Sequence, residues 1–135
     1  MKLAVFGSRS LSGAEVEMAI RETILEQSAD AILTAGEPDG VCKTAQAVAR
    51  AIPLPLTLFF LDFQYLKGAF DHRSRAIVAA SDFVLVIHDG KSKGTANEHE
   101  LVQRLKKPHK YITLEAVKSA VTQTTATELL AGATL

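Results

Sequence analysis

The chain has 135 residues, of which 47% are apolar, and its 15 basic residues balance its 15 acidic ones. A chain of this length and composition can bury a core of its own, so we expect one folded domain and not a disordered polypeptide. The lack of net charge excludes a general electrostatic attraction to nucleic acid or to an anionic membrane.

The single cysteine, Cys42, cannot form an internal disulfide, which suits a reducing compartment. The apolar stretch after Met1-Lys2 is too short for the apolar core of a signal peptide. No stretch of the sequence has the length needed to span a bilayer. We therefore expect a cytoplasmic protein without a membrane partner.

Short apolar runs alternate with helical patterns from the start of the chain. Leu3 to Phe6 has no polar interruption, as expected of a strand that is covered on both faces. Ser12 and Glu15 have the spacing of a capping box, and apolar residues then recur at helical period as far as Ile24. Three further elements are predicted in this half: a strand over residues 31–34, a helix over 41–52 and a strand over 54–61.

The second half of the chain continues the alternation. The patterns predict a helix over residues 69–80, a strand over 82–87, a helix from about Thr95 to Lys107 and a strand over 110–113. Alternation of this kind predicts an α/β fold, a Rossmann-like three-layer domain over residues 1–113 with a mostly parallel sheet of about five strands. Residues 114–135 are expected to form a C-terminal helix or tail packed on the same domain.

The predicted sheet also indicates where a ligand would bind. In open parallel sheets, ligands bind beyond the carboxyl ends of the strands, where the strand order reverses. The helix N-termini at that edge present unpaired N–H groups and positive dipole ends, which favour phosphate. The loops after residues 6, 34, 61 and 87 are therefore the candidates.

The first of these loops begins with Gly7, Ser8 and Arg9. Glycine permits a tight turn or the close approach of a ligand, and serine offers a hydroxyl group. Arginine supplies a fork of donors that suits phosphate or carboxylate. The alternative interpretation is an ordinary strand-to-helix turn that carries a solvated arginine.

The second loop has mainly structural features. Gly36 and Gly40 fit turns, and Asp39 can cap the helix that follows. We expect the backbone N–H groups of Gly40 and Val41 to face the crevice, and Gly36 to lie at the ligand site.

Arg73 stands out in the third predicted helix. It falls on the same helical face as Ile77 and Ala80, which is the face packed toward the sheet. A charge on that face is costly unless it lies at the helix end and reaches a polar site. We expect Arg73 to point toward a ligand; the alternative is a salt bridge to a nearby carboxylate.

The loop after the fourth strand gives the strongest signal. Two glycines, two lysines and two hydroxyl groups precede a helix, a combination that can cradle a phosphate. A nucleoside-triphosphate P-loop is excluded because Leu85 stands where its first glycine should be. Thr95 and Glu98 have the spacing of a capping box, which would also place Glu98 beside the crevice. The ligand-binding candidates in this loop are Asp89, Gly90, Lys91, Ser92, Gly94 and Thr95.

The histidines do not suggest a metal centre. His72, His88 and His99 are scattered along the sequence, and the lone Cys42 adds no second ligand nearby. We therefore expect neither a metal ion nor a cofactor.

Taken together, these loops resemble those of small proteins of the SLOG superfamily related to YspA and YpsA. The resemblance covers residues 2 to about 113, and its most specific part is the Asp-Gly-x-Ser-x-Gly-Thr stretch that starts at Asp89. The superfamily includes the "lonely guy" phosphoribohydrolases and the DNA-processing protein DprA. In the phosphoribohydrolases a helix arginine and a Gly-Gly-x-Gly-Thr-x-x-Glu loop bind and cleave a nucleoside monophosphate. Arg73 matches that arginine, and Gly94, Thr95 and Glu98 match the second half of that loop; His88-Asp89-Gly90 replaces its Pro-Gly-Gly.

The resemblance implies binding of a nucleotide or of an ADP-ribose-like molecule. The alternative is a nucleoside 5′-monophosphate phosphoribohydrolase, in which Glu98 and Arg73 would be catalytic. Single-stranded DNA binding, by analogy with DprA, conflicts with the neutral charge and the few aromatic residues. The phosphoribohydrolases also imply a possible homodimer.

Overall fold

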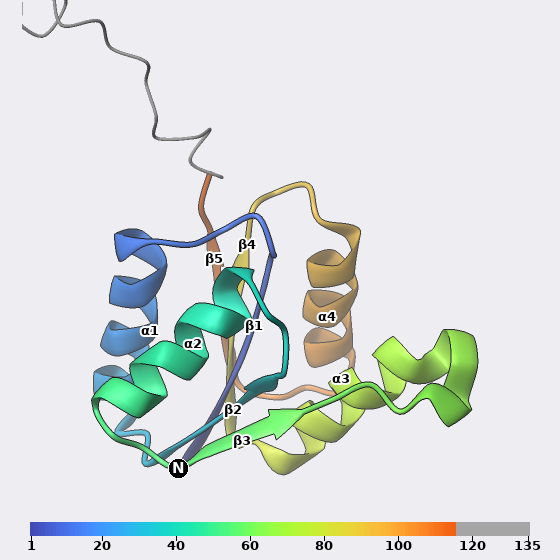
Figure 1. Cartoon of the computed structure of the whole chain (residues 1–135), viewed down its shortest axis with the longest axis horizontal. Coiled ribbons are helices and arrows are strands. Elements are labelled where there is room, and N and C mark those ends of the chain that lie inside the picture. The colour runs from blue at the N-terminus through green and yellow to red at the C-terminus, as the bar shows by residue number, and fades with distance from the viewer. Residues whose placement is uncertain (116–135) are drawn as a thin grey trace, which may run out of the picture.

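The computed structural model describes residues 1–115 of the chain. Five parallel strands form one sheet in the order β3-β2-β1-β4-β5 (Figure 1). The strands are β1 (Lys2–Gly7), β2 (Ala31–Ala35), β3 (Leu56–Phe59), β4 (Phe83–His88) and β5 (His109–Thr113). The chain moves outward from β1 to β3 and then crosses to β4 on the other side of β1, so the strand order reverses at β1.

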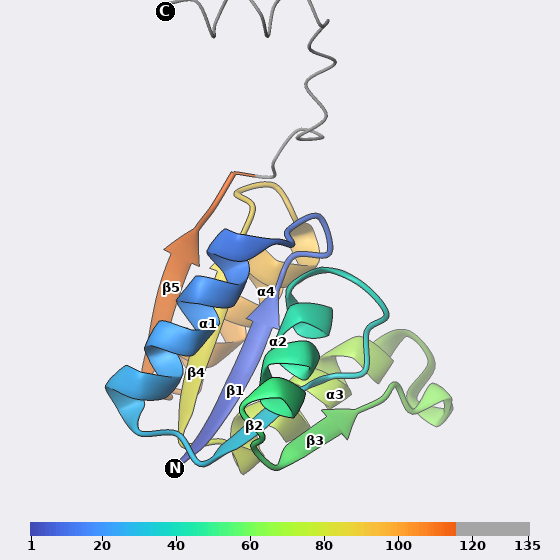
Figure 2. The same cartoon turned by 60° about the vertical axis from the view of Figure 1, so that its left-hand side comes forward.

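Within residues 1–115, four α-helices cover the two faces of the sheet (Figure 2). They are α1 (Ala14–Gln27) and α2 (Gly40–Ala51) on one face, and α3 (Ala69–Ala80) and α4 (Lys93–Arg104) on the other. This arrangement confirms the predicted Rossmann-like three-layer fold. Among the described residues, no helix is long and apolar enough to cross a membrane.

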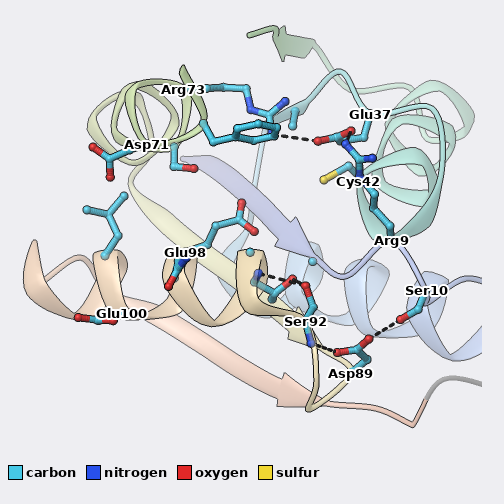
Figure 3. A pocket seen from close by; sticks show the side chains of 18 of the residues that line it. Arg9, Ser10, Glu37, Cys42, Asp71, Arg73, Asp89, Ser92, Glu98 and Glu100 are labelled. Atoms are coloured by element: carbon cyan, nitrogen blue, oxygen red, sulfur yellow. Dashed lines mark hydrogen bonds and ion pairs between the residues drawn. The ribbon is translucent and has the colours of Figure 1, made fainter. Parts of the chain in front are cut away.

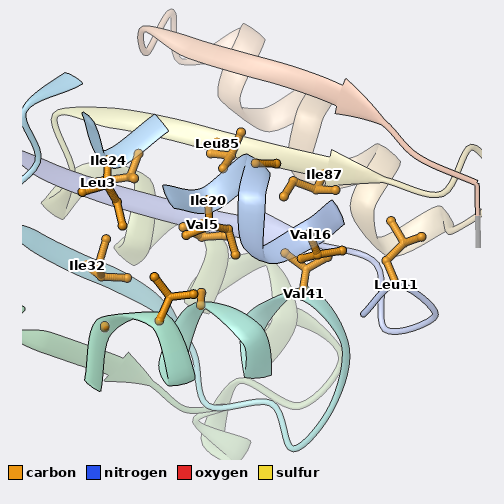
Figure 4. Packing of buried hydrophobic residues seen from close by; sticks show 14 residues of the cluster. Leu3, Val5, Leu11, Val16, Ile20, Ile24, Ile32, Val41, Leu85 and Ile87 are labelled. Atoms are coloured by element: carbon orange, nitrogen blue, oxygen red, sulfur yellow. The ribbon is translucent and has the colours of Figure 1, made fainter. Parts of the chain in front are cut away.

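The apolar strands are buried on both faces, which explains why their sequences lack alternation. In β1, Leu3 and Val5 pack against α1 and α2 (Figure 4). Ala4 and Phe6 pack against the helices of the other face. All four side chains have no exposed surface. Successive side chains of a strand point to opposite faces, so a central strand of a three-layer domain needs apolar residues at every position.

The ends of β1 and β4 lie side by side at the carboxyl edge of the sheet. Gly7 pairs with Ile87 in the ladder, and the Ser8 N–H donates to the Ile87 carbonyl over 3.1 Å. The loops that follow these two strands therefore leave from one point. This is the topological switch point at which α/β sheets hold their ligands.

Both capping boxes expected from the sequence are wrong. Helix α1 is preceded by Gly13, whose φ is 98° and which makes no side-chain cap, so Ser12 does not cap it. Helix α4 begins at Lys93, two residues before the predicted start, because the Ser92 hydroxyl accepts the Thr95 N–H and is the true N-cap. A serine three residues earlier offers the same chemistry as the threonine, and the loop geometry selects it.

The region between β3 and α3 departs furthest from expectation. The edge strand β3 is shorter than the predicted 54–61, and a 3₁₀ segment, η1 (Phe63–Gly68), follows it with a break at Leu66. Phe60, Phe63 and Leu66 expose most of their side chains there. No helix or strand pattern predicts such a segment.

The expected C-terminal helix or tail over residues 114–135 lies outside the described residues, except at its start. The Leu114 N–H donates to the His88 carbonyl over 2.9 Å, and its side chain packs against the core beneath α1. The chain is thus held to the sheet up to this point.

Candidate functional site

A cavity of about 840 Å³ lies at the carboxyl edge of the sheet. Its walls come from the loops after β1, β2 and β4, from η1 and α3, and from α4 along most of its length (Figure 3). The strand-to-helix loops of the sequence predicted a ligand at this edge. The cavity has two chemically different walls and a carboxyl group between them.

The first wall, which we call the arginine wall, consists of Arg9, Glu37 and Arg73. Arg73 leaves the first turns of α3 and is only 9% exposed, and its guanidinium lies over the Phe70 ring at 5.4 Å from the centroid. Its Nη2 donates to Glu37 Oε1 over 2.9 Å. The salt bridge considered as the alternative for Arg73 is therefore present, and Arg73 lines the cavity as well.

Glu37 binds the second arginine too. Its other oxygen, Oε2, accepts a hydrogen bond from Arg9 Nη2. The Arg9 side chain is 60% exposed, whereas the Glu37 side chain is only 12% exposed. One carboxylate thus holds two guanidinium groups, one from the loop after β1 and one from α3. The three groups together carry one net positive charge.

The second wall, the loop wall, has four residues that line the cavity: Ser10, Asp89, Ser92 and Thr95. We include in it the buried Ser8, which holds these loops together but, contrary to the sequence prediction of a ligand contact, does not itself line the cavity. Ser8 is buried, and its hydroxyl accepts the Asp89 N–H over 3.1 Å and lies 3.1 Å from the Thr95 hydroxyl. These bonds tie the loop after β1 to the loop after β4. The hydroxyl groups of Ser8 and Thr95 are directed at each other across this junction.

Asp89 is the centre of the loop wall. Its Oδ1 accepts the N–H groups of Lys91 and Ser92 over 2.8 and 2.7 Å, and its Oδ2 accepts the Ser10 hydroxyl over 2.6 Å. The Ser10 hydrogen bond, with those from the backbone, holds the pKa of Asp89 well below its usual range. The carboxylate thus stabilises the conformation of the loop, and both of its oxygens already accept hydrogen bonds.

Glu98 lies between the two walls. It is part-buried on α4, and its carboxyl group points into the cavity (Figure 3). Burial raises its pKa to about 8, with the Arg73 charge opposing the shift and the Glu37 charge adding to it. Near neutral pH this carboxyl is therefore mainly protonated and can donate a hydrogen bond to a ligand.

Some polar side-chain atoms at the cavity have no hydrogen-bond partner among the described residues. Within residues 1–115, every buried side-chain nitrogen or oxygen has a hydrogen-bond partner. The Nε and Nη1 atoms of Arg73 and the carboxyl oxygens of Glu98 make no hydrogen bond to the described residues, so each of them keeps some exposed surface. These atoms are available to a ligand.

The glycines of the site serve the packing of the loops. A Cβ on Gly7 would lie 2.3 Å from Val41 Cβ, and one on Gly40, where φ is 71°, would lie 2.4 Å from Arg9 Cα. These close approaches bring the start of α2 against the first loop, where the Val41 N–H donates to the Ser8 carbonyl over 3.2 Å. The expectation that the Val41 N–H faces the crevice is wrong, because this bond uses it.

The remaining predicted ligand residues have different placements. Gly94 lines the cavity near the start of α4, and a Cβ there would meet only Ser92 Oγ at 3.9 Å. Gly36, Gly90 and Lys91 lie in the expected loops but are not among the described residues that line the cavity. Gly36 packs beneath the Phe60 ring, and Lys91 is exposed.

Sequence reasoning missed Glu37, Ser10 and the far end of the cavity. Glu37 stands next to Gly36 in a loop interpreted as structural, and only the fold brings it to Arg73, 36 residues along the chain. At the far end, Asp71 and Glu100 lie opposite Arg9 and Ser10 (Figure 3). A carboxylate directly after the second strand was the available signal for Glu37, since that position falls on the carboxyl edge.

Histidines gather on the other side of α4. The His99 ring stacks on Tyr111 at 4.0 Å and meets His109 at 5.5 Å, while His88 Nδ1 lies 2.7 Å from the Tyr111 hydroxyl. Burial, with the nearby His109 and His88, lowers the pKa of His99. Across residues 1–115, no three histidine, cysteine or acidic side chains are grouped so that they could hold a metal ion.

Comparisons with known proteins support the fold. No protein-family model matches the sequence, and no curated protein sequence matches it. Among solved structures, the Moco carrier protein from Chlamydomonas reinhardtii is similar, with a TM-score of 0.54, 17% sequence identity, and coverage of 82% of this chain and 75% of that one. At this identity the similarity shows the shared Rossmann-like α/β fold, and it says nothing of individual site residues.

Proposed function

We propose that this chain binds a nucleotide or a nucleotide-derived phosphorylated molecule in the cavity, with the phosphate against the arginine wall. One observation carries the proposal. Two guanidinium groups, one from the loop after β1 and one from α3, converge at the switch point of the sheet, and one of them, Arg73, is nearly buried yet keeps donors open to the cavity. Arginine forks are suited to phosphate oxygens.

The distribution of charge orients the ligand. Asp71 and Glu100 at the far end would repel a phosphate, although each is ion-paired within its own helix, with Arg75 and Arg104. The arginine wall is positive, and the N-terminal turn of α4 with its open Gly94 lies beside the cavity. The phosphate therefore belongs at the arginine end, and the rest of the molecule extends toward the far end of the cavity, near Asp71 and Glu100.

Two likenesses support this proposal. The loop sequences resemble those of the SLOG superfamily, which implies nucleotide-type ligands. The Moco carrier protein of similar fold is, by its name, a carrier of a small molecule. Together they favour a binding protein for a small molecule.

The loop wall has a supporting role in this proposal. Ser8, Asp89, Ser92 and Thr95 hydrogen-bond to one another or to backbone, and so fix the loop and the start of α4. Ligand contacts with Gly7, Gly36, Gly90 and Lys91 remain predictions from the sequence.

A calorimetric titration tests the proposal. We expect AMP and ADP-ribose to bind the full chain and adenosine, which lacks phosphate, to bind at least about tenfold more weakly, since a charge-assisted contact is lost. Equal affinity for AMP and adenosine would contradict a phosphate site. No binding of any phosphorylated nucleotide would contradict the proposed function altogether.

A second candidate function is hydrolysis of the N-glycosidic bond of a nucleoside monophosphate. The protonated carboxyl of Glu98 favours it, because an acid poised near neutral pH beside a phosphate-binding arginine can donate a proton to a leaving base. Incubation with AMP and chromatography for free adenine tests this activity, with Glu98→Gln as the matched variant. Absence of adenine release by the unmodified protein would leave binding as the function.

A further inference from the structure

Glu37 is a carboxylate that lies at the centre of the proposed phosphate site and pairs with both of its arginines. Both of its carboxylate oxygens already hold the arginines that a phosphate would need, Oε1 with Arg73 and Oε2 with Arg9. The carboxylate thus occupies the place of an anionic ligand. The question is whether this contact is incidental or built into the loop.

The loop that carries Glu37 is fixed on both sides. The Gln46 side chain donates to the Glu37 carbonyl over 3.0 Å and to the Ala35 carbonyl over 3.2 Å. Between these residues, Gly36 lies so close beneath the Phe60 ring that a Cβ would come within 2.1 Å of it. The backbone of the loop is therefore fixed by contacts with Gln46 of α2 and with Phe60 after β3. These contacts place Glu37 beside the two arginines.

We propose that Glu37 is an internal counter-ion that makes the site select a doubly charged phosphate monoester over singly charged groups. The inference rests on the proposed function, because it concerns the same anion site. It assigns to Glu37 a specificity role that the phosphate-binding arginines alone do not provide.

The selectivity follows from the balance of charge at the two arginines. A singly charged group that displaces Glu37 exchanges one anion for another, and it competes with a carboxylate tethered at high effective concentration. A doubly charged group supplies one charge for each arginine and gains attraction that the carboxylate cannot match. Removing the charge of Glu37 abolishes the competition, so that singly charged groups can bind.

The test compares phenyl phosphate with phenyl sulfate, which have the same ring and differ in charge. At about pH 7 a phosphate monoester is mainly doubly charged, because its second pKa is about 6. Titrations followed by protein NMR measure both affinities for the unmodified chain, Glu37→Gln, Glu37→Asp and the exposed control Glu17→Gln. We expect a preference for the phosphate of about tenfold or more in the unmodified chain and the control, and a preference reduced several-fold in Glu37→Gln by tighter sulfate binding.

A second readout separates this role from a merely structural one. Glu37→Gln should lower the melting temperature, because two guanidinium groups then face each other without a counter-ion, yet raise anion affinity. Glu37→Asp keeps the charge and should keep the selectivity. Weaker binding of both probes to Glu37→Gln, or an unchanged preference, would overturn the inference and leave the phosphate site intact.

Arg9→Gln provides the test if Glu37→Gln does not fold, since the Arg9 side chain is exposed. The remaining Arg73–Glu37 pair is neutral, so phenyl phosphate affinity should fall more than phenyl sulfate affinity. An equal fall for both probes would contradict the counter-ion role. Failure of the unmodified chain to bind phenyl phosphate, AMP or ADP-ribose would instead contradict the proposed function itself.

Discussion

The two walls of the cavity differ in how their polar groups are used. In the loop wall, the carboxylate of Asp89 accepts three hydrogen bonds from the loops after β1 and β4, and the hydroxyl groups of Ser8 and Thr95 meet each other. In the arginine wall, the charged groups meet only through Glu37, and Arg73 keeps donors open to the cavity.

This difference indicates that the loop wall is a scaffold and that the arginine wall is the binding surface. A loop whose donors and acceptors are paired internally loses those bonds if a ligand takes them, so it gains little from binding. An ion-paired guanidinium with free donors can add a ligand or exchange its partner. The residues with the strongest sequence signal thus build the site, and the arginine wall is the part that recognises the anion.

The comparison is tested most strongly by Arg73→Ala. We expect AMP affinity to fall about 100-fold, close to 3 kcal/mol, because a buried charge-assisted contact is lost and Glu37 is left with one partner. Arg21→Ala is the matched control, since Arg21 makes an exposed ion pair with Glu17 on α1. Calorimetric titration of both variants with AMP measures the effect. Equal AMP affinities for Arg73→Ala and Arg21→Ala would show that the arginine wall does not bind the phosphate.

Asp89→Ala should damage the scaffold. We expect a loss of about 2 kcal/mol in the free energy of unfolding, because two backbone N–H groups and the Ser10 hydroxyl lose their acceptor. The depressed pKa of Asp89 means that its ionised form stabilises the fold above the usual carboxyl pKa of 3.8, and that this contribution is lost as the pH falls below it. Urea unfolding at neutral and acidic pH measures both effects. A variant as stable as the unmodified chain at neutral pH would show that the loop is not held by Asp89.

Glu98→Gln tests the group between the walls. Because the pKa of Glu98 is raised from 4.5 to about 8, the folded state keeps a proton that the unfolded state loses, and stability falls as the pH rises through that range. The variant lacks this penalty and should gain roughly 1–2 kcal/mol over the unmodified chain near pH 8, less than the full shift implies because the side chain reaches solvent. The difference should vanish at acidic pH. A constant difference between the two proteins at all pH values would contradict the raised pKa.

Ser92→Ala gives the smallest expected effect. Loss of the N-cap of α4 should cost about 1 kcal/mol of stability. Affinity for AMP should change little if the loop wall is a scaffold. A fall in affinity comparable to that of Arg73→Ala would erase the distinction between the two walls.

The sequence predicted the order of the elements and the edge at which the site lies. Buried strands such as β1 and amphipathic helices such as α3 have patterns that follow from local geometry, and Ala69–Ala80 matches the expected helix. The importance of Arg73 was also predictable, because a charge on a packed helix face needs a polar partner.

The partners of Arg73 were not predictable in the same way. The pairing of Glu37 with Arg73 and Arg9 depends on how two loops and α3 meet at the switch point, and no local pattern encodes their separation. The cap of α4 was misassigned because Ser92 and Thr95 have equivalent chemistry, and the choice between them depends on the bonds that Asp89 makes to the loop. Segment η1 has no periodic signal.

The most direct measurement of the central claim is a crystal structure of the chain with AMP. The account predicts the phosphorus atom beside the Arg73 guanidinium at the arginine end of the cavity, with the Glu37 carboxylate withdrawn from at least one of its two arginines. A phosphate bound elsewhere, for example at Lys91 or at the far end near Asp71, with the Glu37 bridge intact, would contradict it.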